Sequence, residues 1–181
     1  MMVSMKLIMK RMVMTTTAAA VFAGTAAFAI QPSANAAATT AISNTQLSTV
    51  QVASVDSVND AAILKVIKLV NQQRVQAGLK PLSVNANLQK VAQVKANDMA
   101  QNGYFDHTSP TYGTPFKMMK TYGITYTYAG ENIAKGQSSA AEVMSDWMNS
   151  PGHKANILNK NFTQIGVGLK NGVWVQEFIR K

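Results

Sequence analysis

Two histidines and a glutamate are the residues of this chain best suited to chemistry. His107 and His153 are its only histidines, and Glu131 is one of three glutamates; each lies in a non-regular segment beside a Gly, Pro or Asp. An imidazole can bind metal or transfer protons near neutral pH. Two imidazoles and a carboxylate could form an open zinc site, with water in the fourth position, or an acid/base set. The alternative is a surface-loop role for His107 and a backbone-bonded turn role for His153.

The segment around His153 is predicted to hold this histidine in one place. The pattern of residues 147–158 predicts the end of one helix, a tight turn and the start of a second short helix. Pro151 suits the first helical position because that position needs no N–H, and Ser150 can cap the exposed amides. This turn therefore presents His153 at a defined position rather than on a flexible loop.

The first 36 residues are predicted to be a secretory signal peptide. Three basic residues precede an uncharged apolar run over residues 12–29, and small-x-small sites end at Ala29 and Ala36. We expect cleavage after Ala36, with Ala29 as the alternative, and no membrane span afterwards. An uncleaved anchor is the weaker reading, because Gly24 and many Ala and Thr residues make a poor spanning helix. The chain has no cysteine, so an exported domain must be held by its core alone.

The charge of the chain favours anionic partners. The formal net charge is +9, and removal of residues 1–36, with three basic and no acidic residues, leaves +6. Such a chain is attracted to anionic polymers. The basic residues are scattered and not interleaved with aromatics, so specific nucleic-acid binding is not expected. Residues 37–58 have one acid and no aromatic, which predicts a flexible linker between the signal peptide and a domain over residues 59–181; a weak strand is the alternative.

Hydrophobic periodicity predicts four helices in that domain. The first has its cap at Asn59 or Asp60 and ends near Ala77, and the second covers about residues 87–101. The third, residues 114–122, has Phe116 and Met119 on its core side. The fourth opens with a capping box formed by Ser139 and Glu142, a role that we prefer for Glu142 over one in a site. These expected elements are read from the printed sequence.

A C-terminal hairpin completes the expected fold. Asn171-Gly172 separates apolar runs at residues 165–169 and 173–178 and is typical of a tight primed turn. Both faces of this hairpin look largely buried, so helices should cover the sheet on both sides. Residues 123–133 are expected to be extended or looped. The predicted fold class is α+β, a three-layer α/β/α sandwich with a small, mainly antiparallel sheet.

Several motifs in order resemble the bacterial branch of the CAP superfamily, which joins cysteine-rich secretory, antigen 5 and pathogenesis-related proteins. The motifs span roughly residues 60–180 and are Asn71-Gln72-Gln73-Arg74, Gly78-Leu79-Lys80-Pro81-Leu82, Asp106-His107-Thr108-Ser109, Gly130-Glu131-Asn132-Ile133, Trp147 to His153, Asn156-Ile157-Leu158 and Ile165-Gly166-Val167-Gly168. The resemblance implies an SCP-like α/β/α sandwich with a large open cleft. Members place two histidines and two glutamates there, sometimes with a divalent metal.

Carried over residue by residue, the resemblance selects three site residues. His107 matches the first histidine, Glu131 the glutamate of the Gly-Glu-Asn motif, and His153 the second histidine. The second family glutamate falls at Ser150, so the chain keeps three of the four. The resulting His/Glu/His set resembles a metal site for an ion such as zinc. Asn132, Ser150 and Asp106 are expected as cleft neighbours.

These features predict a secreted bacterial protein that works in the cell wall or the medium. Fold alone does not give function. The preferred hypothesis is an extracellular ligand- or metal-binding module, whose ligand could be a lipid, a peptide or an anionic wall polymer. The alternative is a metal-dependent hydrolase of peptide or cell-wall material, in which Glu131 is a ligand or base and zinc activates water.

Overall fold

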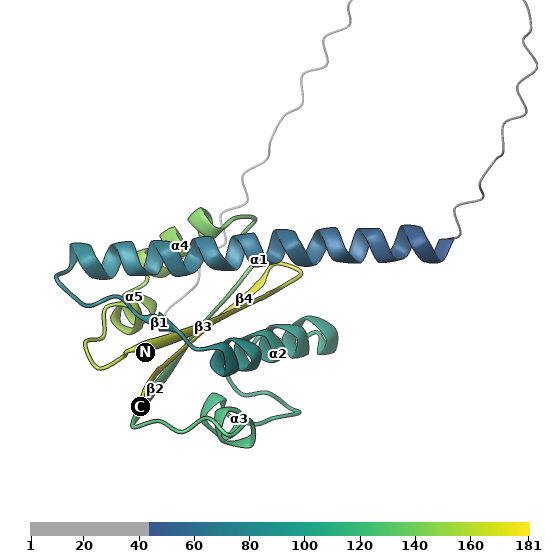
Figure 1. Ribbon diagram of the computed structural model, residues 1–181. Coiled ribbons are helices and arrows are strands. Elements are labelled where there is room, and N and C mark those ends of the chain that lie inside the picture. Colours follow the sequence, from purple (N-terminus) through teal and green to yellow (C-terminus); the bar gives the residue numbers. More distant parts are fainter. Residues whose placement is uncertain (1–43) are drawn as a thin grey trace, which may run out of the picture. The chain divides into compact units, whose positions relative to one another are not determined.

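The computed structural model describes residues 44–181, with side chains from residue 58 onward. The predicted signal peptide and the first residues of the predicted linker lie outside this range. The elements are α1 (Asn44–Gln76), β1 (Ser83–Val84), α2 (Ala86–Asn102), α3 (Pro115–Thr121), β2 (Tyr128–Lys135), α4 (Ala140–Asn149), α5 (Pro151–Ile157), β3 (Gln164–Lys170) and β4 (Val173–Arg180) (Figure 1). No helix among the described residues is long and apolar enough to cross a membrane.

A four-stranded mixed sheet in the order β1-β3-β4-β2 forms the centre of the domain. The predicted hairpin is confirmed: β3 and β4 are antiparallel, and the turn residues Asn171 and Gly172 have φ values of 49° and 73°, as a primed turn requires. The register places Ile165 opposite Phe178. β2 pairs antiparallel with β4 and forms one edge, while the short β1 runs parallel to β3.

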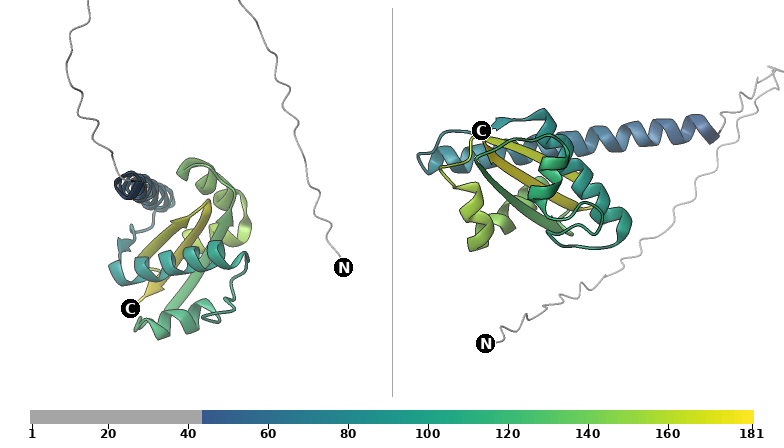
Figure 2. Two further views of the ribbon diagram at one scale, coloured as in Figure 1. Left: turned by 90° about the vertical axis from the view of Figure 1, so that its right-hand side faces the viewer. Right: turned by 90° about the horizontal axis from the view of Figure 1, so that it is seen from below.

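Helices cover both faces of the sheet, which confirms the three-layer sandwich (Figure 2). On one face α2 lies close against β3, because a Cβ on Gly166 would be 2.4 Å from the backbone carbon of Leu88. On the other face α1, α4 and α5 enclose the main core. Its large buried side chains include Val70, Trp147, Ile157, Ile165, Trp174 and Phe178.

Side-chain caps begin α2 and α4, of which the cap of α4 was predicted. Asn85 begins α2 by accepting a hydrogen bond from the backbone N–H of Leu88 at 3.0 Å. Ser139 begins α4 by accepting from the N–H of Glu142 at 3.2 Å. The Glu142 carboxylate accepts from the N–H and the hydroxyl of Ser138, both at 2.8 Å. Glu142 is therefore a capping residue, as expected, although its partner is Ser138 rather than Ser139.

Two sequence-based expectations need correction. The first helix begins at Asn44, so most of the stretch predicted as a flexible linker is helical. No Gly or Pro interrupts residues 44–76, and so nothing in the local sequence stops the helix earlier. In α3, Met119 is buried as expected, but Phe116 is 49% exposed. With Pro115 at the first helical position, residues 115, 118 and 119 share the inner face, and Phe116 points away.

Candidate functional site

His107 and Glu131 form a direct pair at the edge of the sheet. The Nδ1 atom of His107, on the segment between α2 and α3, lies 2.6 Å from Oε1 of Glu131 on β2. The imidazole side chain is 54% exposed, whereas the carboxylate side chain is only 2% exposed. The hydrogen bond to Glu131 raises the pKa of His107 above its usual value. A buried carboxylate thus holds a half-exposed, readily protonated imidazole.

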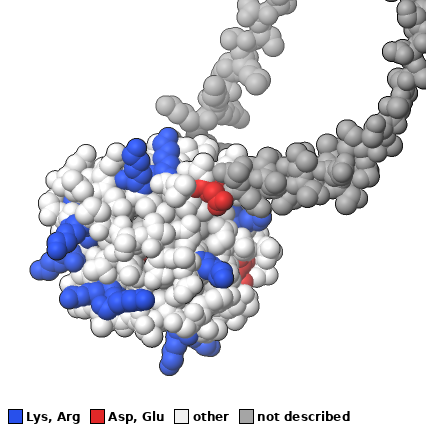
Figure 3. Space-filling model, viewed as in Figure 1, with Lys and Arg blue, Asp and Glu red and all other residues white. Residues whose placement is uncertain are grey.

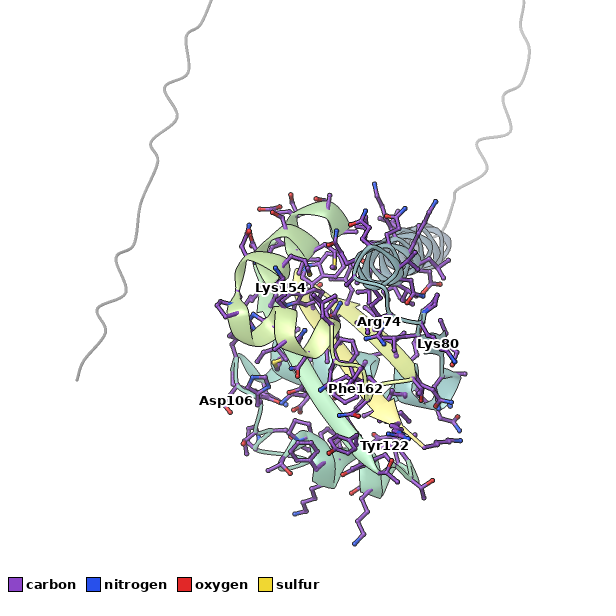
Figure 4. All side chains as sticks on the ribbon, turned by 90° about the vertical axis from the view of Figure 1, so that its left-hand side faces the viewer. Arg74, Lys80, Asp106, Tyr122, Lys154 and Phe162 are labelled. Carbon is purple, nitrogen blue, oxygen red and sulfur yellow. The ribbon has the colours of Figure 1, made fainter. Side chains whose placement is uncertain are left out.

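His153 approaches the same edge from the other face of the sheet. It lies on α5, and its backbone carbonyl accepts a hydrogen bond from Nδ2 of Asn132 on β2 at 3.1 Å. Burial, and then the nearby charge of His107, lowers the pKa of His153 below its usual value. The two histidines therefore flank β2, one inclined to carry a proton and the other inclined to be neutral. Figure 4 shows Asp106 and Lys154, their neighbours in sequence, toward the same side of the molecule.

Hydrogen bonds from a buried ammonium group on α2 hold the segment that carries His107. The Nζ atom of Lys95, fully buried, donates to the carbonyl oxygens of Asp106 at 2.8 Å and His107 at 2.9 Å, and to the Tyr104 hydroxyl at 3.3 Å. Burial lowers the pKa of Lys95, and the charges of nearby carboxylates, Glu131 foremost, oppose this effect. Lys95 thus fixes the backbone of His107 itself.

Asp98, one helical turn after Lys95, holds the rest of the same segment. Its carboxylate accepts from the hydroxyls of Ser109 at 2.7 Å and Thr111 at 2.9 Å, and from the hydroxyl of Tyr104. Burial would raise the pKa of Asp98, but these hydrogen bonds, with one from Asn102, lower it overall. Lys95 and Asp98 together place the loop before α3 on the rigid frame of α2.

Glu177 is a site residue that the sequence analysis missed. It lies on β4 directly opposite Glu131 and is fully buried. Burial, and then the charge of Glu131, raises the pKa of Glu177 well above its usual value. A sequence signal did exist: the hairpin register puts residue 177 opposite Gly166 on a strand predicted to be buried on both faces, where an unpaired glutamate is rare. The chain therefore carries a second carboxylate beside Glu131, at a position other than Ser150.

The three expected cleft neighbours have different places. Asn132 is buried. Its Nδ2 atom donates to Oε1 of Gln176 at 3.0 Å as well as to the carbonyl of His153 on α5. Asp106 is exposed, and its carboxylate accepts from the N–H of Thr108 at 2.7 Å, away from Glu131. Ser150 precedes α5 but makes no side-chain capping bond, contrary to expectation.

The predicted zinc site stays a prediction, because the described residues do not show three ligands close together. Across residues 58–181, no group of three or more His, Asp and Glu side chains lies close enough together to hold a metal ion. Glu131 uses Oε1 for Nδ1 of His107. That contact is typical of a carboxylate that orients an imidazole whose other nitrogen does the binding.

The comparisons with known proteins place these features in a family. Residues 67–178 match the CAP family, described as the cysteine-rich secretory protein family. The chain is 56% identical over 119 residues to the Bacillus subtilis protein YkwD, covering 65% of this chain and 46% of YkwD. It is 32% identical over 117 residues to the B. subtilis membrane protein YlbC, covering 65% of this chain and 34% of YlbC. The chain thus spans less than half the length of these two relatives.

Solved structures agree with the family assignment. An extracellular SCP-domain protein of Bacillus anthracis superposes with a TM-score of 0.67 at 35% identity, over 68% of this chain and 41% of that protein. An outer surface protein of Borrelia burgdorferi superposes with a TM-score of 0.59 at 24% identity, over 64% of this chain and 89% of that protein, a likeness of fold. With its sandwich and its family match over residues 67–178, this chain belongs to the CAP family and is of the bacterial SCP type.

Proposed function

We propose that this CAP domain is an extracellular binding module that recognises an anionic cell-wall polymer at the His107–His153 edge of β2. The observation that carries the proposal is the protonation-prone, half-exposed imidazole of His107, held by buried Glu131. A protonated imidazole donates a charge-assisted hydrogen bond to phosphate or carboxylate oxygens. An extracellular location is supported by the predicted signal peptide and by the B. anthracis and B. burgdorferi proteins, described as extracellular and outer-surface proteins.

The distribution of charge over the surface supports an anionic ligand. From residue 58 onward, three of the acidic side chains, Asp98, Glu131 and Glu177, are buried. Four acidic side chains are exposed, against eleven exposed basic ones: Lys65, Lys68, Lys80, Lys90, Lys117, Lys120, Lys135, Lys154, Lys160, Arg180 and Lys181. Figure 3 shows the resulting excess of basic side chains on one face. This surface attracts polyanions at long range, and the histidine pair supplies a point of closer contact.

A sedimentation or affinity experiment with isolated wall polymer tests the proposal. The protein should bind a phosphate-containing wall polymer at low salt, bind more weakly as salt screens the surface, and ignore a neutral glycan of the same length. His107→Gln should weaken binding several-fold more than Lys90→Gln, which removes one positive charge from the exposed side of α2. Equal effects of the two substitutions, or equal binding to the neutral glycan, would refute a site at His107.

The alternative function is the metal-dependent hydrolase. The observation that favours it is again the His107–Glu131 contact, because an imidazole oriented by a carboxylate suits acid/base chemistry and metal binding. The described residues do not bring three ligands together, so we assign no reaction step to a metal. Zinc titration, with His153→Ala and His107→Ala as controls, decides this point. Stoichiometric zinc bound only by the parent, with chelator-sensitive cleavage of a peptidoglycan or peptide library, would establish the hydrolase.

A further inference from the structure

The buried residue Glu177 lies directly across the sheet from Glu131. The two residues are directly opposed on the antiparallel strands β2 and β4, so their side chains leave the same face with Cβ atoms about 5 Å apart. Glu177 is also opposed to Gly166 on β3, the glycine that α2 closes over. As a result, Glu177 is covered by α2 and has no exposed surface. It cannot touch a ligand and can act only through its neighbours.

The carboxyl oxygens at this contact lack the donors that buried carboxylates need. Among the described residues, Oε2 of Glu131 and both oxygens of Glu177 are buried without a hydrogen-bond partner. The buried cation nearby, Lys95 on α2, donates to Tyr104, Asp106 and His107. Buried polar groups are almost always paired, and two ionised carboxylates side by side in the interior repel each other strongly. One proton held between the two carboxyl groups satisfies both conditions.

We propose that Glu177 is a positioning residue for the histidine site: as a neutral acid it donates a hydrogen bond to Oε2 of Glu131, while Oε1 of Glu131 accepts from Nδ1 of His107. The chain of contacts runs from the interior to the surface. Burial of Glu177 supports the neutral form, since a fully buried carboxyl group favours its proton. Glu131 is thereby held in its contact with Nδ1 of His107, and the other ring nitrogen of His107 is left for the ligand.

Two variants and one control separate this role from simple packing. Glu177→Gln keeps a neutral side chain of the same shape that can still donate to Glu131. Glu177→Leu keeps an uncharged side chain of similar volume without a donor. Glu142→Gln makes the same chemical change as the first variant at the exposed cap of α4, far from the contact in sequence and function. The readout is the imidazole titration of His107, followed by NMR in the full chain without added ligand, so it is independent of the polymer proposal.

The variants are expected to differ in their effect on His107. Glu177→Gln and Glu142→Gln should leave the raised pKa of His107 in place. Glu177→Leu should lower it toward the ordinary imidazole value of about 6.5, because Glu131 without an internal donor is no longer held in place for the hydrogen bond that raises the pKa of His107. A purely structural role for Glu177 would leave His107 unmoved in Glu177→Leu, and an ionised Glu177 would make Glu177→Gln shift His107; either result overturns the proposal.

A measurement on the parent protein keeps the proposal testable if Glu177→Leu does not fold. The ¹³C shift of the Glu177 side-chain carboxyl at pH 7 should be that of a protonated acid. An ionised Glu177 carboxylate overturns the proposal. The same spectra recorded with and without zinc exclude a bound cation as the reason for the unpartnered oxygens, because a cation would bring both carboxyls to the ionised form.

Discussion

At the scale of single residues, the site depends on how little water reaches Glu131. Its carboxylate has 2% of its surface exposed, and one oxygen contacts an imidazole that is 54% exposed. The pKa of His107 rises because the hydrogen bond favours its charged form, while the pKa of His153, without such a partner, falls with burial. The surroundings thus shift the pKa values of two chemically identical side chains in opposite directions, as is usual where acid and base roles are divided.

The first prediction concerns Glu131→Gln. A histidine whose folded pKa is raised stabilises the fold below its unfolded pKa, and this contribution is lost as pH rises through the folded pKa. The parent should therefore exceed Glu131→Gln in stability more at about pH 5.5 than at about pH 8.5, and the pKa of His107 should fall toward its usual value in the variant. Urea unfolding at both pH values and an NMR titration measure this. A stability difference that grows with pH would contradict the pairing.

At the scale of elements, α2 is the part of the scaffold that places His107. Lys95 and Asp98 lie one turn apart on its inner side and bind the following segment at five of its residues: Tyr104, Asp106, His107, Ser109 and Thr111. α5 is placed in a comparable way by Arg74 of α1, whose buried guanidinium donates to the carbonyls of Ile157 at 2.8 Å and Asn159 at 2.9 Å. Lys95 thus bonds the carbonyl of His107 itself, whereas Arg74 bonds the end of the helix that carries His153.

The second prediction is that Lys95→Met strongly destabilises the fold and frees the segment before α3. The substitution removes a buried charge that satisfies two backbone carbonyls, and losing one partner of a buried charged network costs about 3 kcal/mol or more. Urea unfolding gives the free energy, and hydrogen exchange should accelerate at residues 104–111. Lys90→Met, on the exposed side of the same helix, should change the free energy of unfolding by less than about 0.5 kcal/mol. Similar losses of stability in the two variants would contradict the role of the Lys95 hydrogen bonds in holding the segment before α3.

The third prediction tests how α2 meets the sheet. A Cβ on Gly166 would lie 2.4 Å from backbone atoms of Leu88 and Gln89, so Gly166→Ala must move the helix and should cost about 1–3 kcal/mol or more. Gly152→Ala in α5, where a Cβ meets nothing within 4 Å, should be neutral or slightly stabilising. Thermal unfolding of both variants is sufficient. Equal melting temperatures would show that α2 does not press on the sheet at Gly166.

The elements also show what the sequence could and could not predict. The hairpin was predictable because the Asn171-Gly172 turn is a local signal, and α2 because its apolar residues recur at helical spacing. β2 was expected only as extended or looped chain, since it alternates poorly and owes its place to pairing with β4. Glu177 escaped notice because its meaning depends on which residue lies opposite it. Contacts between distant strands leave little trace in local sequence.

At the scale of the whole molecule, basic side chains predominate on the surface. From residue 58 onward, three acidic side chains (Asp98, Glu131 and Glu177) and two basic ones (Arg74 and Lys95) are buried, and the exposed charged side chains are mostly basic (Figure 3). α2 covers one face of the sheet and α1 with α5 the other (Figure 2), and the two histidines contact neighbouring residues, Glu131 and Asn132, of the edge strand β2.

The most direct test of the account is to add a phosphate-containing wall polymer to labelled protein and follow both imidazoles by NMR. We predict that the signals of His107 and His153 shift together and saturate at one affinity, that the pKa of His107 rises further, and that the effects fade with salt. Shifts confined to the scattered lysines, with both imidazoles unchanged, would contradict a common binding edge at β2.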